Sequence, residues 1–500
     1  MTVATCGKGE KHRLVGPARH GDDRGMSART RLGYASGSLV TGAFNTLPGL
    51  LLLPYLTDTL GVGAAVAGAV VLVPKVWDVL LTPYAGRTSD RTRGRWGPRR
   101  GHVLGGGLGV AAAFALMFAG AARGTAGALW AAAGFLLTAT AFAFFQVAYA
   151  ALPAEIATSP RDRVRLVGGR VAGIAVAALV AGAAAPAVVE AGGGGLSGHR
   201  WAGLFGALVV AVGTLGVFFG TSRATAPGVP HGVPEEAGRP GGAGPRTWFA
   251  VLRADAHFAA LLRGATVLVV GTGVLLAGCP YYAEHVLERP AMTGVLVAAF
   301  VLPNLFTTAA WSRVAARYGH RRVLGLSCAL FAGGALLLPA APVMPAFWAP
   351  AALLVVGTGH AGQLLFLYAM LAECAAGDAA RTGRSRAGAM SGLFSAGEAL
   401  GMAVGPFLMG LVLQASGYVS SDTGHATGQG SGAAWGVLAG MGLLPALAAA
   451  AGLVLLRGFR SAAHPAPAGP AEAQAQAQAG AVAEAVAGFT PAGGRPPVRV

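Results

Sequence analysis

Long apolar stretches separated by short polar ones run along most of this 500-residue chain. A membrane-spanning helix needs about 20 predominantly apolar residues, and a window of about 19 residues finds such stretches repeatedly. Bilayer hydrocarbon offers no partner to unpaired backbone groups, so the spans must be helical. The pattern therefore predicts an all-α membrane protein with twelve spans, at residues 34–56, 63–85, 103–122, 127–151, 166–190, 201–219, 258–282, 292–314, 322–341, 347–373, 387–415 and 432–456.

A polar connection divides the predicted spans into two sets of six. It is rich in Pro and Gly, which is typical of a flexible linker. A basic turn recurs after the second span (86–100) and after the eighth (311–322), which indicates two parallel halves with a solute site between them. The expected domains are an N-terminal extension, a six-helix bundle, the linker, a second six-helix bundle and a disordered tail, at 1–30, 31–219, 220–257, 258–456 and 457–500.

Composition and charge narrow the class of protein. A chain that is 54% hydrophobic and 11% charged is not built of soluble domains. The net charge of +17 would suit nucleic-acid binding, but the arginines gather in alternate loops, as the positive-inside rule requires. We therefore expect a multi-pass protein of the plasma (inner) membrane with both termini cytoplasmic, and no nucleic-acid partner. The basic loops contain Arg87, Arg91, Arg93, Arg95, Arg99 and Arg100, then Arg161, Arg163 and Arg165, then Arg313, Arg317, Arg321 and Arg322, then Arg381, Arg384 and Arg386.

The N-terminal thirty residues contain no apolar core of a signal peptide, so the first span is expected to act as the insertion signal. Translation is expected to begin either at Met1 or at Met26, which lies shortly before that span. The four cysteines show no CxxC spacing and no accompanying histidine cluster, which argues against a disulfide framework or a metal site. No cofactor is expected.

The second span carries the first candidate for chemistry, since an ionisable side chain inside a membrane is costly unless it is paired or lines a cavity. Lys75 and Asp78 stand at i and i+3, on one helix face, and Thr82 follows one turn later. Asp78 lies nine residues before Arg87, about 13 Å inward from the cytoplasmic end. The carboxylate is expected to bind a proton or, with Thr82, a hard cation. The alternative is a structural Lys75–Asp78 ion pair.

The end of the fourth span and the start of the fifth offer hydrogen-bonding groups. Gln146 and Tyr149 could face a polyhydroxylated solute, or they could simply join helices. Arg170 begins the fifth span, and we assign it to the solute together with Trp77. Glu155, followed by three arginines, is expected in a cytoplasmic charge network.

The second half holds a comparable set of polar residues. Tyr368 is assigned to the solute, and Glu373 to the cytoplasmic charge network with Asp90 and Arg91 of the first half. Glu398 lies inside the eleventh span. It is expected either to carry a proton or cation, or to pair with Lys75 or Arg170, and we group it with the gating charges.

Three segments together resemble one transporter family. They are RLGYASGSLV, LTDTLGV and VPKVWDVLLTPYAGRTSDRTRGRWGPRR, which lie in order between residues 31 and 100. Later segments, including QVAYAALPAE (146–155) and EALGMAVGP (398–406), are similar as well. The pattern resembles the melibiose-permease-like glycoside-pentoside-hexuronide:cation symporters of the major facilitator superfamily, over nearly all of 31–456.

The resemblance implies two six-helix bundles that move a solute by alternating access with a coupling cation, in a monomer. Asp78 matches the first acid of the family's cation site, Lys75 its nearby basic position, and Arg170 the arginine of the fifth helix. Thr82 replaces a second acid, and Gln146 the acid of the fourth helix. The remaining departures are the lack of an acid near Ser38 or Gly42 and the replacement of a lysine by Ala399.

The leading hypothesis is a secondary symporter that moves a sugar or glycoside with H⁺ or Na⁺. The loss of polar site groups would also suit an exporter of an amphipathic or natural-product molecule. A membrane enzyme would need convergent acid, base or metal groups, and the spans contain no HExxH, CxxC or phosphate loop. A sensor would need an output domain. We therefore expect a transporter and not an enzyme.

Overall fold

The computed structural model describes residues 26–92, 99–120, 122–157, 160–222, 245–382, 386–421 and 429–459. Every regular element in these ranges is helical. Ten helices are long and apolar enough to cross a membrane. They are α3 (Ala64–Arg91), α4 (Arg100–Ala119), α5 (Gly124–Ile156), α6 (Pro160–Ala191), α7 (Gly195–Gly220), α9 (Ala256–His285), α13 (His320–Leu337), α14 (Trp348–Thr382), α15 (Ala387–Ala415) and α16 (Ser431–Leu455).

The first and eighth predicted spans are broken helices. After α1 (Ala28–Ser36) and α2 (Ser38–Leu47), the chain continues through two π-helical stretches, η1 (Pro48–Leu52) and η2 (Tyr55–Thr59). Proline cannot donate to the α-helical ladder, and Pro48 and Pro54 precede or begin these stretches. The eighth span consists of α10 (Met292–Val301), α11 (Pro303–Phe306) and α12 (Thr308–Tyr318), with a bend of 54° before α12. All twelve predicted spans thus correspond to helical segments.

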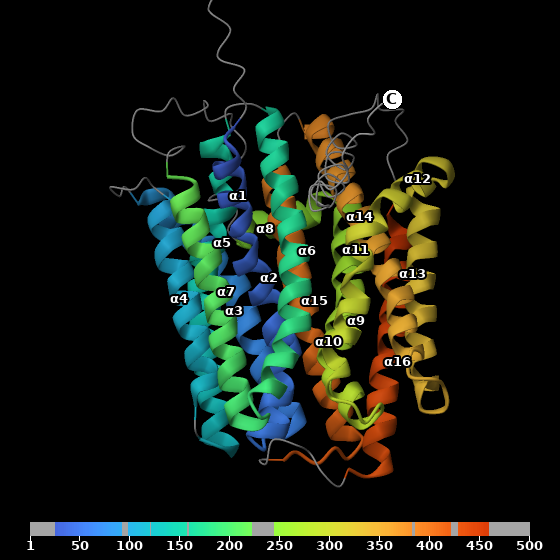
Figure 1. Cartoon of the computed structure of the whole chain (residues 1–500). Helices are drawn as coiled ribbons and strands as arrows, with labels where there is room; N and C mark the ends of the chain where they lie inside the picture. Colours follow the sequence, from blue (N-terminus) through green and yellow to red (C-terminus); the bar gives the residue numbers. More distant parts are fainter. Residues whose placement is uncertain are drawn as a thin grey trace, which may run out of the picture.

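The helices form two bundles side by side, with the first half of the chain in one and the second half in the other (Figure 1). In the first, α4 packs on α5 and α7, and α2 on α6. In the second, α9 packs on α15 and α16, and α13 on α14. Small residues allow this close packing: a Cβ at Gly405 of α15 would collide with the backbone of Gly273 of α9. The predicted all-α, two-bundle architecture is confirmed.

The two bundles meet through α3 against α15 and α6 against α10. The helix ends define two ends of the molecule. At the linker end, α1 begins, α7 ends and α16 ends; at the distal end lie η2 and the connection between α15 and α16 (Figure 1).

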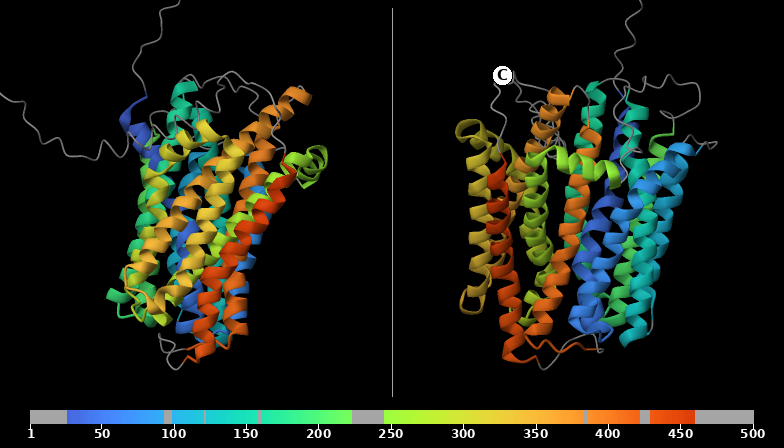
Figure 2. Two further views of the ribbon diagram at one scale, coloured as in Figure 1. Left: turned by 90° about the vertical axis from the view of Figure 1, so that its right-hand side faces the viewer. Right: turned by 180° about the vertical axis from the view of Figure 1, so that it is seen from behind.

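The segment predicted as a flexible linker contains a helix. α8 (Pro245–Ala254) lies across the direction of the spans at the linker end (Figure 2). Asp255 then caps α9 by accepting hydrogen bonds from the backbone N–H groups of His257 and Phe258 at 3.0 Å. The segment predicted as linker, 220–257, thus has helical structure from Pro245 onward.

Candidate functional site

Asp78 is an enclosed carboxylate in the middle of α3. Its side chain is only 8% exposed and that of Lys75, one turn earlier, 5%. Among the described residues, no hydrogen-bond donor and no ion-pair partner contacts the carboxylate, although Lys75 is near enough to act on it electrostatically. The structure therefore places the two side chains on one face, as the spacing predicted, without a direct ion pair between them.

Aromatic rings hold Lys75 in place. Its Nζ atom lies 3.5 Å from the ring centroid of Phe44 on α2 and 5.9 Å from that of Phe135 on α5. The ammonium also donates a long hydrogen bond of 3.4 Å to the carbonyl oxygen of Phe44. A cation over ring faces is stabilised without a counter-ion. The alternative of a tight structural pair with Asp78 is therefore not what the structure contains.

Two neighbours of Asp78 point elsewhere. The hydroxyl of Thr82 donates to the main-chain carbonyl of Asp78 at 2.8 Å, so its proton is used within the helix. The indole of Trp77 donates to Thr140 on α5 at 3.0 Å, and its ring belongs to an exposed apolar stripe. That stripe also contains Val73, Leu80 and Tyr84. Trp77 thus lies about 100° around α3 from Asp78, and the structure does not bring it to the other assigned residues.

Tyr149 is the centre of a polar cluster between α2, α5 and α6. Its hydroxyl donates to the carbonyl of Tyr34 at 2.9 Å and lies 3.1 Å from the hydroxyl of Ser38. The guanidinium carbon of Arg170 lies 5.1 Å from the centroid of the Tyr149 ring. Ser38 in turn donates to the carbonyl of Arg170 at 2.8 Å. Two of the residues assigned to the solute, Tyr149 and Arg170, are therefore in contact.

Gln146 lies one helical turn before this cluster. Its side-chain oxygen accepts a hydrogen bond of 2.9 Å from Thr41 on α2. The interaction joins two helices of the first bundle, which was one of the two interpretations of the sequence.

In the second bundle, Tyr368 of α14 donates a hydrogen bond of 2.9 Å to Glu398 of α15. The Tyr368 side chain is 48% exposed, packs on Phe394 and lies near enough to Arg170 of the other half for electrostatic interaction. Within the described part of the chain, neither Lys75 nor Arg170 forms an ion pair with Glu398. Of the two alternatives for Glu398, the described residues thus do not form the pairing with Lys75 or Arg170, and the structure places Glu398 beside Tyr368, a solute candidate.

Charge networks at the linker end occupy equivalent places in the two halves. Glu155 at the end of α5 pairs with Arg99 at 3.2 Å, and Glu373 of α14 lies 3.4 Å from His320, at the start of α13. The repeat seen in the basic turns thus extends to the acids that face them. Asp90 and Arg91 were expected here too, but their side chains lie outside the described residues.

Sequence analysis did not predict a third charge network at the linker end. Asp378, fully buried, accepts from Arg386, with its Oδ2 atom 2.8 Å from the Nε atom, and Arg381 bridges to Asp255 at 2.5 Å. Burial opposes ionisation of Asp255, but the N–H of Phe258 and the guanidinium of Arg381 outweigh it and lower its pKa. The spacing of Asp378 and Arg381 at i and i+3 was the sequence feature that could have indicated this network.

The distal end holds the two halves together by hydrogen bonds that the sequence did not reveal. Tyr418 donates to Asp58 at 2.7 Å, and its hydroxyl lies 2.9 Å from Nε2 of His285. Thr57 and Tyr281 join through their hydroxyls at 2.7 Å. We call these five residues the distal latch. Asp58 lies beyond the first apolar stretch, and burial raises its pKa to about 7, against stabilisation of the charged form by Tyr418.

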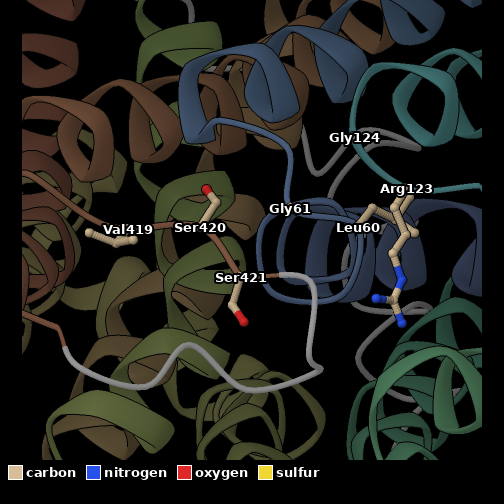
Figure 3. Close-up of a pocket in the computed structure, with 7 residues that line it drawn as sticks. All are labelled: Leu60, Gly61, Arg123, Gly124, Val419, Ser420 and Ser421. Atoms are coloured by element: carbon tan, nitrogen blue, oxygen red, sulfur yellow. The ribbon is translucent and has the colours of Figure 1, made fainter.

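Backbone contacts extend the latch along the seam between the halves. The N–H of Ser421 donates to the carbonyl of Thr57 at 2.9 Å, and the Ser420 hydroxyl to the carbonyl of Val62 at 2.8 Å. A pocket of about 450 Å³ opens beside them, lined by residues of both halves (Figure 3). Its lining consists of Leu60, Gly61, Arg123, Gly124, Val419, Ser420 and Ser421. None of the residues assigned to ion or solute lines it.

Among the described residues, hydrogen bonds between the halves are confined to the distal end. In the same part of the chain, no hydrogen bond or ion pair joins the halves at the linker end, where the charge networks stay within one half. The described hydrogen bonds between the halves thus hold them together at the distal end.

Comparisons with known proteins agree with this geometry. The sequence profile of the MFS/sugar transport protein family matches residues 33–460. An uncharacterized symporter, sll1374, of Synechocystis is 40% identical over 77 residues, which cover 15% of this chain and 14% of that one. A glucuronide carrier protein homolog of Escherichia coli is 39% identical over 79 residues, or 16% and 17% of the two chains. The matched segments thus span less than a fifth of these relatives.

Solved transporters share the fold. A bacterial homolog of the human lysosomal transporter Spinster, in an inward-facing and unoccupied conformation, superposes with a TM-score of 0.61 and 15% identity, covering 92% of this chain and 99% of that chain. A mutant of the nucleoside transporter NupG gives 0.60 and 14%, covering 86% and 99%. At these identities the likeness concerns the fold alone. With the family profile extending over nearly the whole of both bundles, the chain belongs to the MFS/sugar transport protein family of the major facilitator superfamily.

Proposed function

We propose that the protein is a proton-coupled symporter of a sugar or glycoside, which works by alternating access in the plasma membrane. The observation that carries the proposal is Asp78: an enclosed carboxylate within a span, with no hydrogen-bond donor and no ion-pair partner among the described residues. A structural carboxylate would be paired, because an unpaired buried charge is strongly unfavourable. A carboxylate that gains and loses a proton in each cycle has to be left without a permanent partner.

The surroundings of Asp78 favour a proton over sodium. A metal cation needs several oxygen ligands, and no cluster of three or more acids, histidines or cysteines occurs in the described ranges. Lys75, held over Phe44, adds a positive charge that would oppose a second cation. A single carboxylate beside an ammonium is suited to exchanging one proton.

The solute site is proposed on the two facing polar groups, Tyr149 with Arg170 in the first half and Tyr368 with Glu398 in the second. Tyrosine rings and hydroxyls suit a polyhydroxylated ligand, since one face packs on sugar C–H groups and the edge hydrogen-bonds. The printed name of one relative refers to a glucuronide carrier, which is consistent with a sugar-like solute. The natural-product exporter remains the second candidate, favoured by the uncharged Thr82 and Gln146 in place of acids within the spans.

The positive-inside distribution of arginines supports placing the linker end in the cytoplasm, with both termini. We infer that the distal latch then closes the outer face of the protein in this conformation. We propose that a single chain performs the cycle and that it needs no cofactor and catalyses no reaction.

Purified protein in proteoliposomes tests coupling. An inward proton gradient should drive sugar accumulation by the native chain, and Asp78→Asn should lose accumulation while counterflow, which needs no gradient, survives. Thr82→Val is the matched control, because proton transfer at Asp78 does not need that hydroxyl, whereas sodium coordination would. Accumulation that requires sodium, or that disappears in Thr82→Val, would contradict proton coupling. Outward movement of apolar amines without sugar counterflow would favour the exporter.

A further inference from the structure

Glu398 is an intramembrane carboxylate that the coupling mechanism does not use. We propose that Glu398, oriented by Tyr368, is the solute subsite of the second half. It binds the end of a polyhydroxylated solute that carries hydrogen-bond donors, hydroxyl or amino groups, and it disfavours solutes with a carboxylate there. The inference rests on the proposed transport function and adds the charge class of the solute.

The hydrogen bonding of Glu398 is incomplete. A carboxylate offers about four acceptor positions, and the described residues fill one, through the hydroxyl of Tyr368 on the Oε2 atom. No described cation forms an ion pair with either oxygen. The donated hydrogen bond fixes the carboxylate and leaves its remaining acceptor positions for a ligand or water.

The position of the pair directs it toward the other half. Tyr368 is 48% exposed and lies near enough to Arg170 for electrostatic interaction, although the two belong to different bundles. Its ring packs on Phe394, one turn before Glu398 on α15. An ionisable group inside a span, bonded to a half-exposed tyrosine that lies near the opposite bundle, belongs to the solute path rather than to bundle packing.

The charges across the seam are opposite in sign. Arg170 supplies only donors, and Glu398, when ionised, supplies only acceptors. A solute lying between them must present acceptors to the first half and donors to the second. Hydroxyl groups satisfy both, and an amino group facing Glu398 adds charge attraction. A carboxylate at that end would meet like charge, so the order of preference at Glu398 is amine, then hydroxyl, then carboxylate.

Counterflow in proteoliposomes tests this order without an ion gradient. The probes are three forms of one sugar, with an amino group, a hydroxyl group or a uronate, competing against a labelled neutral glycoside. The native chain should prefer the amino or neutral form over the uronate. Glu398→Gln, which keeps the shape, should reduce the amino-to-uronate preference about tenfold, the size expected for a charge-assisted hydrogen bond. Tyr368→Phe should reduce it less, and Glu190→Gln, at an exposed carboxylate on α6, should leave it unchanged.

Several outcomes overturn the proposal. A Glu398→Gln protein that counterflows with an unchanged preference removes Glu398 from the solute. A Glu398→Gln protein with unchanged preference that loses only gradient-driven accumulation makes Glu398 a proton carrier instead. Failure of the native chain to move any sugar would contradict the proposed function. The Glu398 subsite is then tested separately, by measuring thermal unfolding of the protein with each of the three sugars. Stabilisation by the amino sugar over the uronate, lost in Glu398→Gln, supports it; equal stabilisation or none contradicts it.

Discussion

Replacing Tyr418 by phenylalanine should open the distal end of the protein. The change removes one hydroxyl, which donates to Asp58 of the first half and also contacts His285 of its own half. The ring can remain in place, with its edge toward Tyr281 at a centroid distance of 5.5 Å. The perturbation therefore acts on the hydrogen bonding between halves and leaves the packing of the second half intact.

The size of the effect follows from the burial of the pair. Tyr418 is 6% exposed and Asp58 4%, so the carboxyl group loses its donor in a place that water scarcely reaches. Loss of a hydrogen bond to a buried carboxyl group costs about 2 kcal/mol, and the cost applies only while the distal end is closed. The ratio of distally open to distally closed molecules should rise about thirtyfold.

Spin labels on Ala122→Cys and Val419→Cys, in a background without the native cysteines, would measure this ratio. Both positions are exposed, and they lie on opposite sides of the distal seam. Distance distributions of the native and Tyr418→Phe proteins should differ by a longer component in the variant. Tyr282→Phe is the matched control, because its hydroxyl donates to Leu338 within the second half, at 2.6 Å. An unchanged distribution in folded Tyr418→Phe, or the same change in Tyr282→Phe, would refute the role of the latch.

Three further predictions concern the latch and the bundles. Burial, together with Glu284, raises the pKa of Asp58 to about 7 from the ordinary 3.8, so the closed distal end binds the extra proton. Asp58 therefore contributes easier opening as pH rises from about 4 to about 7, and Asp58→Asn should remove that contribution, seen as a difference between the pH profiles of the two proteins in the same distance measurement. Asp255→Ala removes the N-cap of α9 and the partner of Arg381. It should lower the free energy of unfolding by about 1–2 kcal/mol, measured as a lower midpoint in thermal unfolding. An unchanged midpoint would contradict the role of Asp255 as a cap. Gly405→Val forces α15 away from Gly273 of α9, and should prevent recovery of folded protein in size-exclusion chromatography, while Gly101→Val, where nothing lies within 4 Å of the added Cβ, should not.

The spans were predictable because their signal is length and hydropathy, which do not depend on tertiary contacts. The face shared by Lys75 and Asp78 was predictable for a similar reason, since the helix period fixes it. The direction of Trp77 was not, because it depends on which bundle face α3 buries. The distal latch could not be predicted from the sequence either. Asp58 and Tyr418 are 360 residues apart, and they are neighbours only because the two bundles meet.

The partner of Glu398 also could not be predicted from the sequence. Its place inside a span was evident, and the opposite charges of Lys75 and Arg170 made them the natural partners on charge alone. In the structure, Lys75 instead lies over the ring of Phe44, and Arg170 lies over the ring of Tyr149. Aromatic rings compete with carboxylates for cations in an apolar setting, and a sequence does not reveal which ring will be near.

The first span, with its π-helical turns, makes the position of the latch residues depend on the number of residues before them as well as on their identity. A π turn is an α-helix with an added residue, and each residue of an α-helix turns the chain by about 100°. Deleting one residue from Pro48–Leu52 would restore the ordinary pitch and leave the chain beyond it in nearly the same direction. Deleting one from the α-helical Ser38–Leu47 would instead rotate everything beyond it by about 100°, carrying Asp58 away from Tyr418 without altering either side chain. Point substitutions do not change the rotation along a helix, so the alignment of the latch can be altered by insertion or deletion in a segment that contains none of its residues.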